Sequence, residues 1–207
     1  MRLFTAVYPP REVLEHLDLA LGGVGGPSAS APGSGLRWVP SAQRHVTLAF
    51  HGEVPDGAVE DYVDELATVV ARAAPFETAL VGSGTFGGRT LWVGVGGEVD
   101  RLRALSHEVA RAADAVGIAG ADRAGGRPHL TVARVSAARR GRDRHGRGRG
   151  APRETDPATP FARWARALAV YRGPTWPVRT VHVVASRLGA GRSGGPAHED
   201  VAVLPLG

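Results

Sequence analysis

The chain has 207 residues and a formal net charge of +5 at pH 7, and 43% of its residues are hydrophobic and 22% charged. This composition is that of a globular protein and excludes disordered and fibrous proteins. It contains no cysteine, which excludes disulfides, thiolate metal sites and a cysteine nucleophile. No uncharged apolar run reaches the ~18 residues of a membrane span, so we expect one domain, neither exported nor membrane-bound, in a reducing cytoplasm.

The N-terminal quarter predicts a strand, a helix and a second strand-like region. Residues 3–7 are apolar, and Pro9 and Pro10 stand where a helix would begin. Residues 22–35 are rich in Gly, Ser and Pro and predict a loop. Residues 36–54 are strand-like.

Within this region the segment RHVTLAFHG alternates between polar or small and apolar residues. Strict alternation predicts that one face carries four residues, namely His45, Thr47, Ala49 and His51.

An amphipathic helix and a hairpin follow. Asp56 can cap a helix whose apolar positions fit the 3.6-residue period over residues 59–70. Residues 76–86 and 90–95 predict two strands joined by a Gly-Gly turn.

A second helix and a second alternating segment come next. The helix is predicted over residues 102–116, with Gly117 placed to end it. The segment RPHLTVARV then repeats the earlier pattern, with His129, Thr131 and Ala133 predicted on one face.

The C-terminal part begins with residues 137–160, where Arg residues stand among Gly and Pro and predict a flexible loop. A short helix over residues 161–171, a strand over residues 178–186 and a last strand ending near Leu206 complete the order. Because hairpins interrupt the alternation of strand and helix, an antiparallel α+β fold is favoured over a parallel doubly wound sheet.

The two His-x-Thr segments are the strongest candidate site. Each projects an imidazole and a hydroxyl from one face of a strand. A single strand histidine is more often a packing or surface residue, but His45 with Thr47 and His129 with Thr131 form two copies in similar context. The repetition favours a single site.

Such a set suits phosphodiester hydrolysis. A neutral imidazole accepts a proton from water and an imidazolium protonates the leaving oxygen. The threonines can donate hydrogen bonds to the non-bridging phosphate oxygens. Alternation and spacing alone do not assign which histidine is the acid.

The chain resembles the RNA 2′,3′-cyclic phosphodiesterases, also called the bacterial 2′-5′ RNA ligase family, within the two-histidine (2H) phosphoesterase superfamily. The resemblance extends over nearly the whole chain. It is carried by the segments RLFTAVYPP, RWVP, RHVTLAFHGEV, GTFGGRTLWVGV, RPHLTVAR, YRGPTWPVRTVHVVASRL and GPAHEDVAVLPL.

The resemblance implies two pseudo-symmetric lobes, each an antiparallel sheet with helices on the outside, around a central groove in a single domain of residues 1–207. It implies that His45 is the proton donor, that His129 is the proton acceptor, and that Thr47 and Thr131 bind the phosphate. The implied reaction opens an RNA-terminal 2′,3′-cyclic phosphate to a 2′-phosphate.

Other residues are secondary candidates. Arg134 follows the second motif as in the family, but its parity places it on the face opposite His129 and leaves a structural role as plausible as a phosphate contact. Phe86 can stack on a base, although a core role is favoured for it. His51 is either a third imidazole on the motif face or a solvated strand-end residue, and the second interpretation is favoured. The isolated histidines outside the motifs, including His198, show no catalytic pattern.

The sequence predicts no metal and no cofactor, because metal-ligand patterns and a P-loop lysine are absent. We expect RNA ends or nucleotides with a cyclic phosphate as ligands, no membrane, no obligate protein partner and a monomer. The Arg-rich residues 137–160 either aid RNA binding or are dispensable. Two alternatives stay open: a phosphodiesterase for small cyclic nucleotides, ADP-ribose cyclic phosphate or 2′-5′ linked oligonucleotides, and a binding module without turnover.

Overall fold

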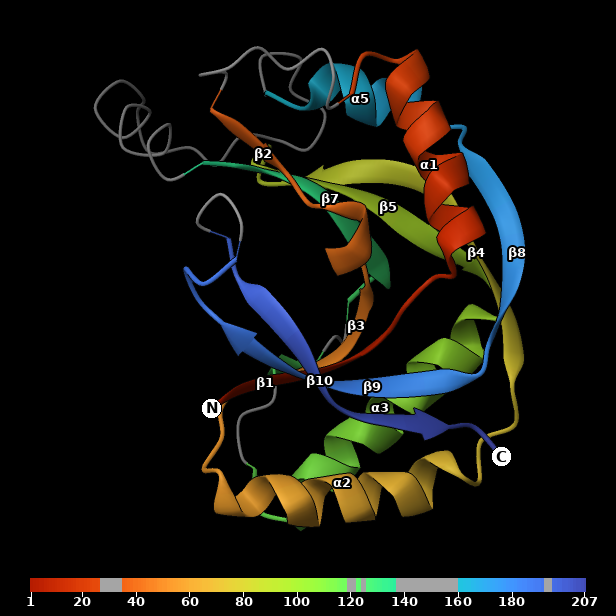
Figure 1. Ribbon diagram of the computed structural model, residues 1–207. Helices are drawn as coiled ribbons and strands as arrows, with labels where there is room; N and C mark the ends of the chain where they lie inside the picture. The colour runs from red at the N-terminus through yellow and green to blue at the C-terminus, as the bar shows by residue number, and fades with distance from the viewer. Residues whose placement is uncertain (27–34, 119–121, 124–125, 137–159, 192–194) are drawn as a thin grey trace.

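The computed structural model describes residues 1–26, 35–118, 122–123, 126–136, 160–191 and 195–207 (Figure 1). The described helical elements are α1 (Arg11–Gly23), the 3-10 turn η2 (Ser41–Gln43), α2 (Gly57–Val70), α3 (Val99–Ala115) and α5 (Ala162–Ala167). The described strands are β1 (Arg2–Val7), β2 (Leu36–Trp38), β3 (Val46–Glu53), β4 (Phe76–Phe86), β5 (Thr90–Gly97), β6 (Asp122–Arg123), β7 (His129–Val135), β8 (Arg172–Val178), β9 (Thr180–Arg187) and β10 (Ala197–Pro205).

The strands form one curled sheet in the order β10-β9-β1-β3-β7-β5-β4-β8, with β2 added to β7 and β6 added to β3 (Figure 1). The described pairings are antiparallel, which confirms the predicted α+β class. The two halves of the sheet meet where Val46 of β3 pairs with Leu130 of β7. Because the pairing is continuous across this junction, the prediction of two lobes with separate sheets is not confirmed.

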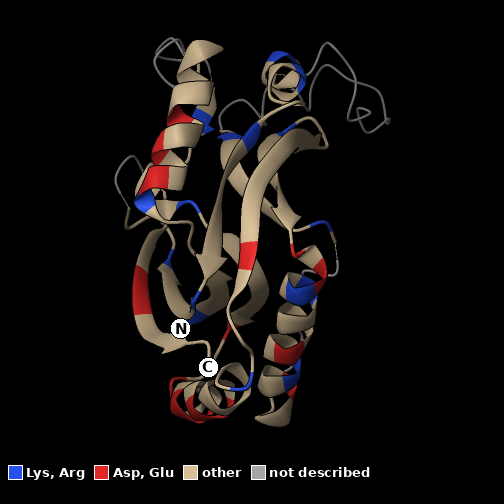
Figure 2. Cartoon of the chain, turned by 90° about the vertical axis from the view of Figure 1, so that its right-hand side faces the viewer, with Lys and Arg blue, Asp and Glu red and all other residues tan. Residues whose placement is uncertain are grey.

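The helices cover the sheet in two groups. α3 packs on β3 and on α2, while α1 lies against β8 and α5 against β4. Their buried apolar side chains and those of the strands form one main core. The acidic residues of α2 lie at one end of the molecule (Figure 2).

Two predicted elements near prolines were wrong in extent. The strand-like residues 36–54 are split by η2, which Pro40 precedes, because proline cannot supply the N–H that a sheet ladder needs. The helix predicted to reach residue 171 ends at Ala167, and the unpredicted strand β8 follows. β8 contains Pro174 and Pro177 and lies at the edge of the sheet, where prolines are tolerated.

Asp56 occupies the predicted N-cap position of α2, but its side chain makes no capping hydrogen bond. Its carboxylate instead accepts a hydrogen bond from the Met1 ammonium at 3.2 Å. The predicted flexible loop at 137–160 falls, except for its last residue, outside the described residues. Of the helices that the structure describes, none has the length and apolar character needed to cross a membrane.

Candidate functional site

The junction between the two halves of the sheet lies in the middle of both His-x-Thr motifs. Val46 and Leu130, the central residues of the motifs, pair with each other and are 1% and 0% exposed in the main core. Side chains on either side of a strand residue point to the opposite face. The His and Thr of each motif therefore leave the core together, on what we call the site face of the sheet.

The antiparallel register relates the two motifs to each other. The Val46–Leu130 pair joins β3 to β7, and in an antiparallel arrangement the residues that flank such a pair on the two strands lie next to each other. The His and Thr side chains of both motifs are half-buried. The pairing of Val46 with Leu130 thus brings the two motifs side by side, and the charge of a protonated His129 lowers the pKa of His45.

A bulge follows the first motif. In β3 the register passes from Ala6–Thr47 to Thr5–Ala49, so Leu48 is an extra residue that pairs with no residue of β1. The bulge shifts the alternation of the following residues by one position, as far as His51, where a second register shift occurs. Leu48 and Ala49 both enter the main core as a result.

The second motif has a bulge at the same place. In β7 the register with β5 passes from Trp92–Thr131 to Leu91–Ala133 and leaves Val132 as the extra residue. Val132 and Ala133 are both fully buried. The two motifs therefore share a backbone irregularity in addition to their side chains.

The first bulge overturns both interpretations of His51. Strict alternation put His51 on the face of His45, but the structure places it in the core at 4% exposure. Its Nε2 lies 3.0 Å from the Thr5 hydroxyl and 2.9 Å from the Tyr62 hydroxyl. Burial lowers the pKa of His51 to about 4. It is neither a third site imidazole nor a solvated residue, and the predicted position of Ala49 on the site face was wrong for the same reason.

The second bulge corrects the placement of Arg134 and Ala133. Arg134 was predicted on the face opposite His129, but two successive core residues return it to the site face. It is exposed, and its charge contributes to lowering the pKa of both His45 and His129. Arg134 is thus close enough to both imidazoles to act electrostatically on them.

Both motif histidines are oriented by the same backbone hydrogen bond. Nδ1 of His45 lies 2.8 Å from the Gln43 carbonyl oxygen, and Nδ1 of His129 lies 3.0 Å from the Arg127 carbonyl oxygen. A carbonyl oxygen only accepts, so Nδ1 carries the proton in each ring. Nε2 is therefore the nitrogen that is available for proton transfer in both motifs.

The turn before His45 is held by an ion pair between a buried arginine and an exposed carboxylate. Arg44 is 3% exposed and donates to Asp18 of α1 at 2.6 Å and to the Val39 carbonyl at 3.1 Å. A buried guanidinium requires such partners. This residue anchors the entry to the first motif on α1.

Aromatic side chains enclose His45. Its ring stacks on Phe4 with centroids 4.7 Å apart, and Tyr8 and His198 lie at 5.5 Å. Burial is the largest cause that lowers its pKa to about 4, and the charge of Arg134 and the charges that His198 and His129 carry when protonated add to it. His45 is neutral at pH 7 in the free protein.

His129 has a more open environment. Phe86, which is 41% exposed, lies at 4.8 Å between centroids in an edge-to-face arrangement, and Trp92 lies at 6.3 Å. Burial is the main cause that lowers the pKa of His129, and Arg134 adds to it. Phe86 is therefore not a core residue, and it borders His129 on the site face.

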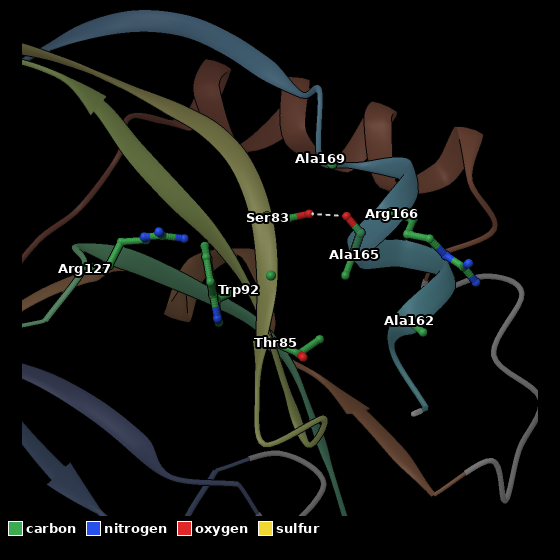
Figure 3. A pocket seen from close by; sticks show the side chains of 9 residues that line it. Ser83, Thr85, Trp92, Arg127, Ala162, Ala165, Arg166 and Ala169 are labelled. Atoms are coloured by element: carbon green, nitrogen blue, oxygen red, sulfur yellow. Dashed lines mark hydrogen bonds between the residues drawn. The ribbon is translucent and has the colours of Figure 1, made fainter. Parts of the chain in front are cut away.

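A pocket of about 270 Å³ adjoins the His129 side, where β4 and β5 meet α5 (Figure 3). Trp92 and Arg127 line it from the strand side, and Ser83 donates a hydrogen bond to the Ala165 carbonyl of α5 at 2.8 Å. A Cβ atom at Gly84 would stand 2.3 Å from the Trp92 ring, so only glycine admits the indole there. Trp92 thus connects this pocket with His129, although neither motif histidine lines it.

The structure adds His198 to the residues around the motifs. It lies on β10, far along the chain from both motifs, and no local pattern distinguished it from other histidines. The pairing of β10 with β9, and of β9 with β1, brings it to the His45 side. Among the described residues, no group of three or more His, Cys, Asp or Glu is arranged to hold a metal ion.

Comparisons with known proteins agree on one protein family. A family model described as the 2′-5′ RNA ligase superfamily matches residues 29–148. The chain belongs to this superfamily. The match includes both His-x-Thr motifs and the strands β3 and β7 that carry them, so the predicted resemblance is confirmed.

Relatives named RNA 2′,3′-cyclic phosphodiesterase occur in several organisms. The protein of Geobacillus stearothermophilus is 42% identical over 101 residues, which are 47% of this chain and 32% of the relative. The protein of Thermus thermophilus is 34% identical over 146 residues, which are 66% of this chain and 70% of the relative. The chain spans 32%, 64% and 56% of the length of three of these relatives.

Solved structures show the same fold. TT0787 of Thermus thermophilus superposes with a TM-score of 0.68 at 26% identity, covering 100% of this chain and 98% of that chain. LigT of E. coli in its apo form gives a TM-score of 0.68 at 19% identity, covering 99% and 96%.

Proposed function

We propose that this protein is a hydrolase that opens RNA-terminal 2′,3′-cyclic phosphates to 2′-phosphates by metal-independent acid–base catalysis with His45 and His129. Membership of the superfamily and the names of the relatives support a cyclic phosphodiesterase. The single observation that carries the proposal is the pairing of Val46 with Leu130, which joins the two motifs at their central residues.

The proposed reaction is an attack by water on the cyclic phosphate. Nε2 of His129 accepts a proton as the water oxygen forms a bond with phosphorus. The bond between phosphorus and the 3′ oxygen breaks, and that oxygen takes a proton from Nε2 of His45. The products are a 3′ hydroxyl and a 2′-phosphate. Thr47 and Thr131 donate to the non-bridging oxygens, where negative charge is greatest.

The protonation states fit this scheme once the phosphate is bound. The pKa of His45 is about 4 in the free protein, whereas a proton donor must be an imidazolium. A phosphate anion between the two rings favours the protonated form of a nearby imidazole. Arg134 on the site face offsets part of the phosphate charge and weakens this effect. Substrate binding is therefore coupled to proton uptake at His45.

The assignment of acid and base follows from the family resemblance, and the environment of each histidine is compatible with it. His45, the more enclosed ring, would hold its proton next to the 3′ oxygen away from bulk water. His129, the more open ring, would meet the incoming water. Phe86 would contact the terminal base, and Arg134 the phosphate.

The experiment is to incubate the protein, in EDTA, with an oligonucleotide that ends in a 2′,3′-cyclic phosphate and to identify the position of the product phosphate. We expect a 2′-phosphate and a bell-shaped dependence of kcat/KM on pH. A 3′-phosphate would mean that the 2′ oxygen, and not the 3′ oxygen, is the leaving group. Loss of activity in EDTA that Mg²⁺ or Zn²⁺ restores would contradict metal independence.

Two comparisons separate this function from its alternatives. If small cyclic nucleotides, ADP-ribose cyclic phosphate or 2′-5′ linked oligonucleotides are turned over faster than the cyclic-phosphate oligonucleotide, the proposed substrate is wrong but the proposed site stands. RNA binding without any hydrolysis would favour a binding module. An enzyme for RNA ends should gain in kcat/KM from flanking nucleotides.

We also propose a single domain that functions in the cytoplasm as a monomer, without an obligate partner. The absence of cysteine suits a reducing compartment. Sedimentation of the purified protein tests the monomer directly.

A further inference from the structure

A third imidazole stands beside His45 on the site face. The rings of His198 and His45 lie 5.5 Å apart between centroids and are inclined by 68°. Phe4 lies within 5.0 Å of His198 and stacks on His45, so the three rings form one cluster.

His198 is held next to His45 by the turn that orients His45. The side-chain amide of Gln43 donates to the Pro196 carbonyl at 3.0 Å, while the Gln43 carbonyl accepts the Nδ1 proton of His45. Gln43 therefore fixes the positions of both imidazoles. His198 therefore has a defined position beside His45.

One ring nitrogen of His198 is available to meet a ligand. Among the described residues, its Nδ1 is buried without a partner, and Nε2 belongs to the accessible part of the half-exposed ring. A buried N–H without an acceptor is costly, and a buried imidazolium is more so. The favoured form is the neutral tautomer with the proton on Nε2. Burial also lowers the pKa of His198, in agreement with a neutral ring.

We propose that His198 is a further substrate-binding residue, which donates a hydrogen bond from a neutral Nε2–H to the substrate oxygen next to His45. The inference rests on the proposed function. It gives His198 a tautomer opposite to that of the two motif histidines, whose protons are on Nδ1. A neutral donor stabilises negative charge on the oxygen without opposing the protonation of His45, as a second imidazolium would.

The test compares three variants of His198 on the cyclic-phosphate oligonucleotide. His198→Phe keeps the ring contacts with Phe4 and His45 but removes the donor, and we expect kcat/KM to fall by about 10- to 100-fold, as for a hydrogen bond to a charged group. The amide nitrogen of Gln reaches the position of Nε2, whereas that of Asn reaches the position of Nδ1. His198→Gln should therefore recover most of the loss and His198→Asn should not.

The control and the second readout keep the test decisive. His107→Phe, on the exposed face of α3, should leave kcat/KM unchanged. Affinity for inorganic phosphate should fall in His198→Phe and His198→Asn and recover in His198→Gln. Unchanged values in His198→Phe, or equal losses in Gln and Asn, would overturn the inference. If the wild-type protein binds phosphate but hydrolyses no cyclic phosphate, the proposed function fails, and the phosphate affinities alone decide the role of His198.

Discussion

The His45 half and the His129 half of the site have the same backbone features but different surroundings. Both motifs have the same bulge after the threonine and the same bond from Nδ1 to the carbonyl two residues earlier. His45 is enclosed by three rings, whereas His129 borders an exposed phenylalanine and a pocket. The repeated backbone features fix where the reactive nitrogen of each histidine lies. The different surroundings set the protonation state of each ring and its access to solvent.

The largest expected effect is the loss of either motif histidine. His45→Ala and His129→Ala should each lower kcat for the cyclic-phosphate oligonucleotide by about 10²- to 10⁴-fold, the usual contribution of a general acid or base. His107→Ala is the matched control. Full activity in either variant would mean that the two halves do not act as one site.

His51 tests the consequence of the bulge in β3. Its folded pKa of about 4 lies below the unfolded value of about 6.5, so its contribution to stability is present above pH 6.5 and is lost as the pH falls toward 4. Between pH 7.5 and pH 4.5, the free energy of unfolding of the wild type should fall by about 2 to 3 kcal/mol more than that of His51→Gln. Urea unfolding at both pH values measures this. Parallel losses in the two proteins would place His51 in solvent.

The threonines test whether both motifs hold the phosphate. Thr47→Val and Thr131→Val keep the shape and remove one donor to a charged phosphate, so each should lower kcat/KM by about tenfold. Thr68→Val, on the exposed side of α2, is the control. An effect in only one of the two variants would show that the phosphate is held by one half of the site.

Phe86 gives the smallest expected effect and tests the open side. Phe86→Ala should raise KM for the oligonucleotide by about fivefold, the lower range for a base stacked on an aromatic ring, with little change in stability because the ring is 41% exposed. Leu188→Ala, another exposed apolar residue, is the control. A large loss of thermal stability would instead assign Phe86 a structural role.

Alternation predicted the motif residues themselves, because the two positions that matter lie before each bulge. It failed beyond them. A bulge needs no special residue, and Leu48 and Val132 are ordinary apolar side chains. One signal was present: in both motifs the threonine is followed by an apolar residue and then Ala, which means two consecutive core residues. That pattern would have moved His51 into the core and Arg134 onto the site face.

His198 could not have been found from local sequence. Its place beside His45 depends on the pairing of β10, β9 and β1 and on the hydrogen bond from Gln43 to Pro196. Such contacts join residues that are far apart in the chain. Similarly, nothing in the pattern of β8 distinguished an edge strand with two prolines from a loop.

The central claim is that two distant motifs form one site for a phosphate anion, and histidine titration by NMR tests it most directly. With saturating inorganic phosphate, the pKa values of His45 and His129 should both rise above their values in the free protein, that of His45 from about 4. The pKa of buried His51 should not change. A rise at only one motif histidine, or at neither, would contradict the claim.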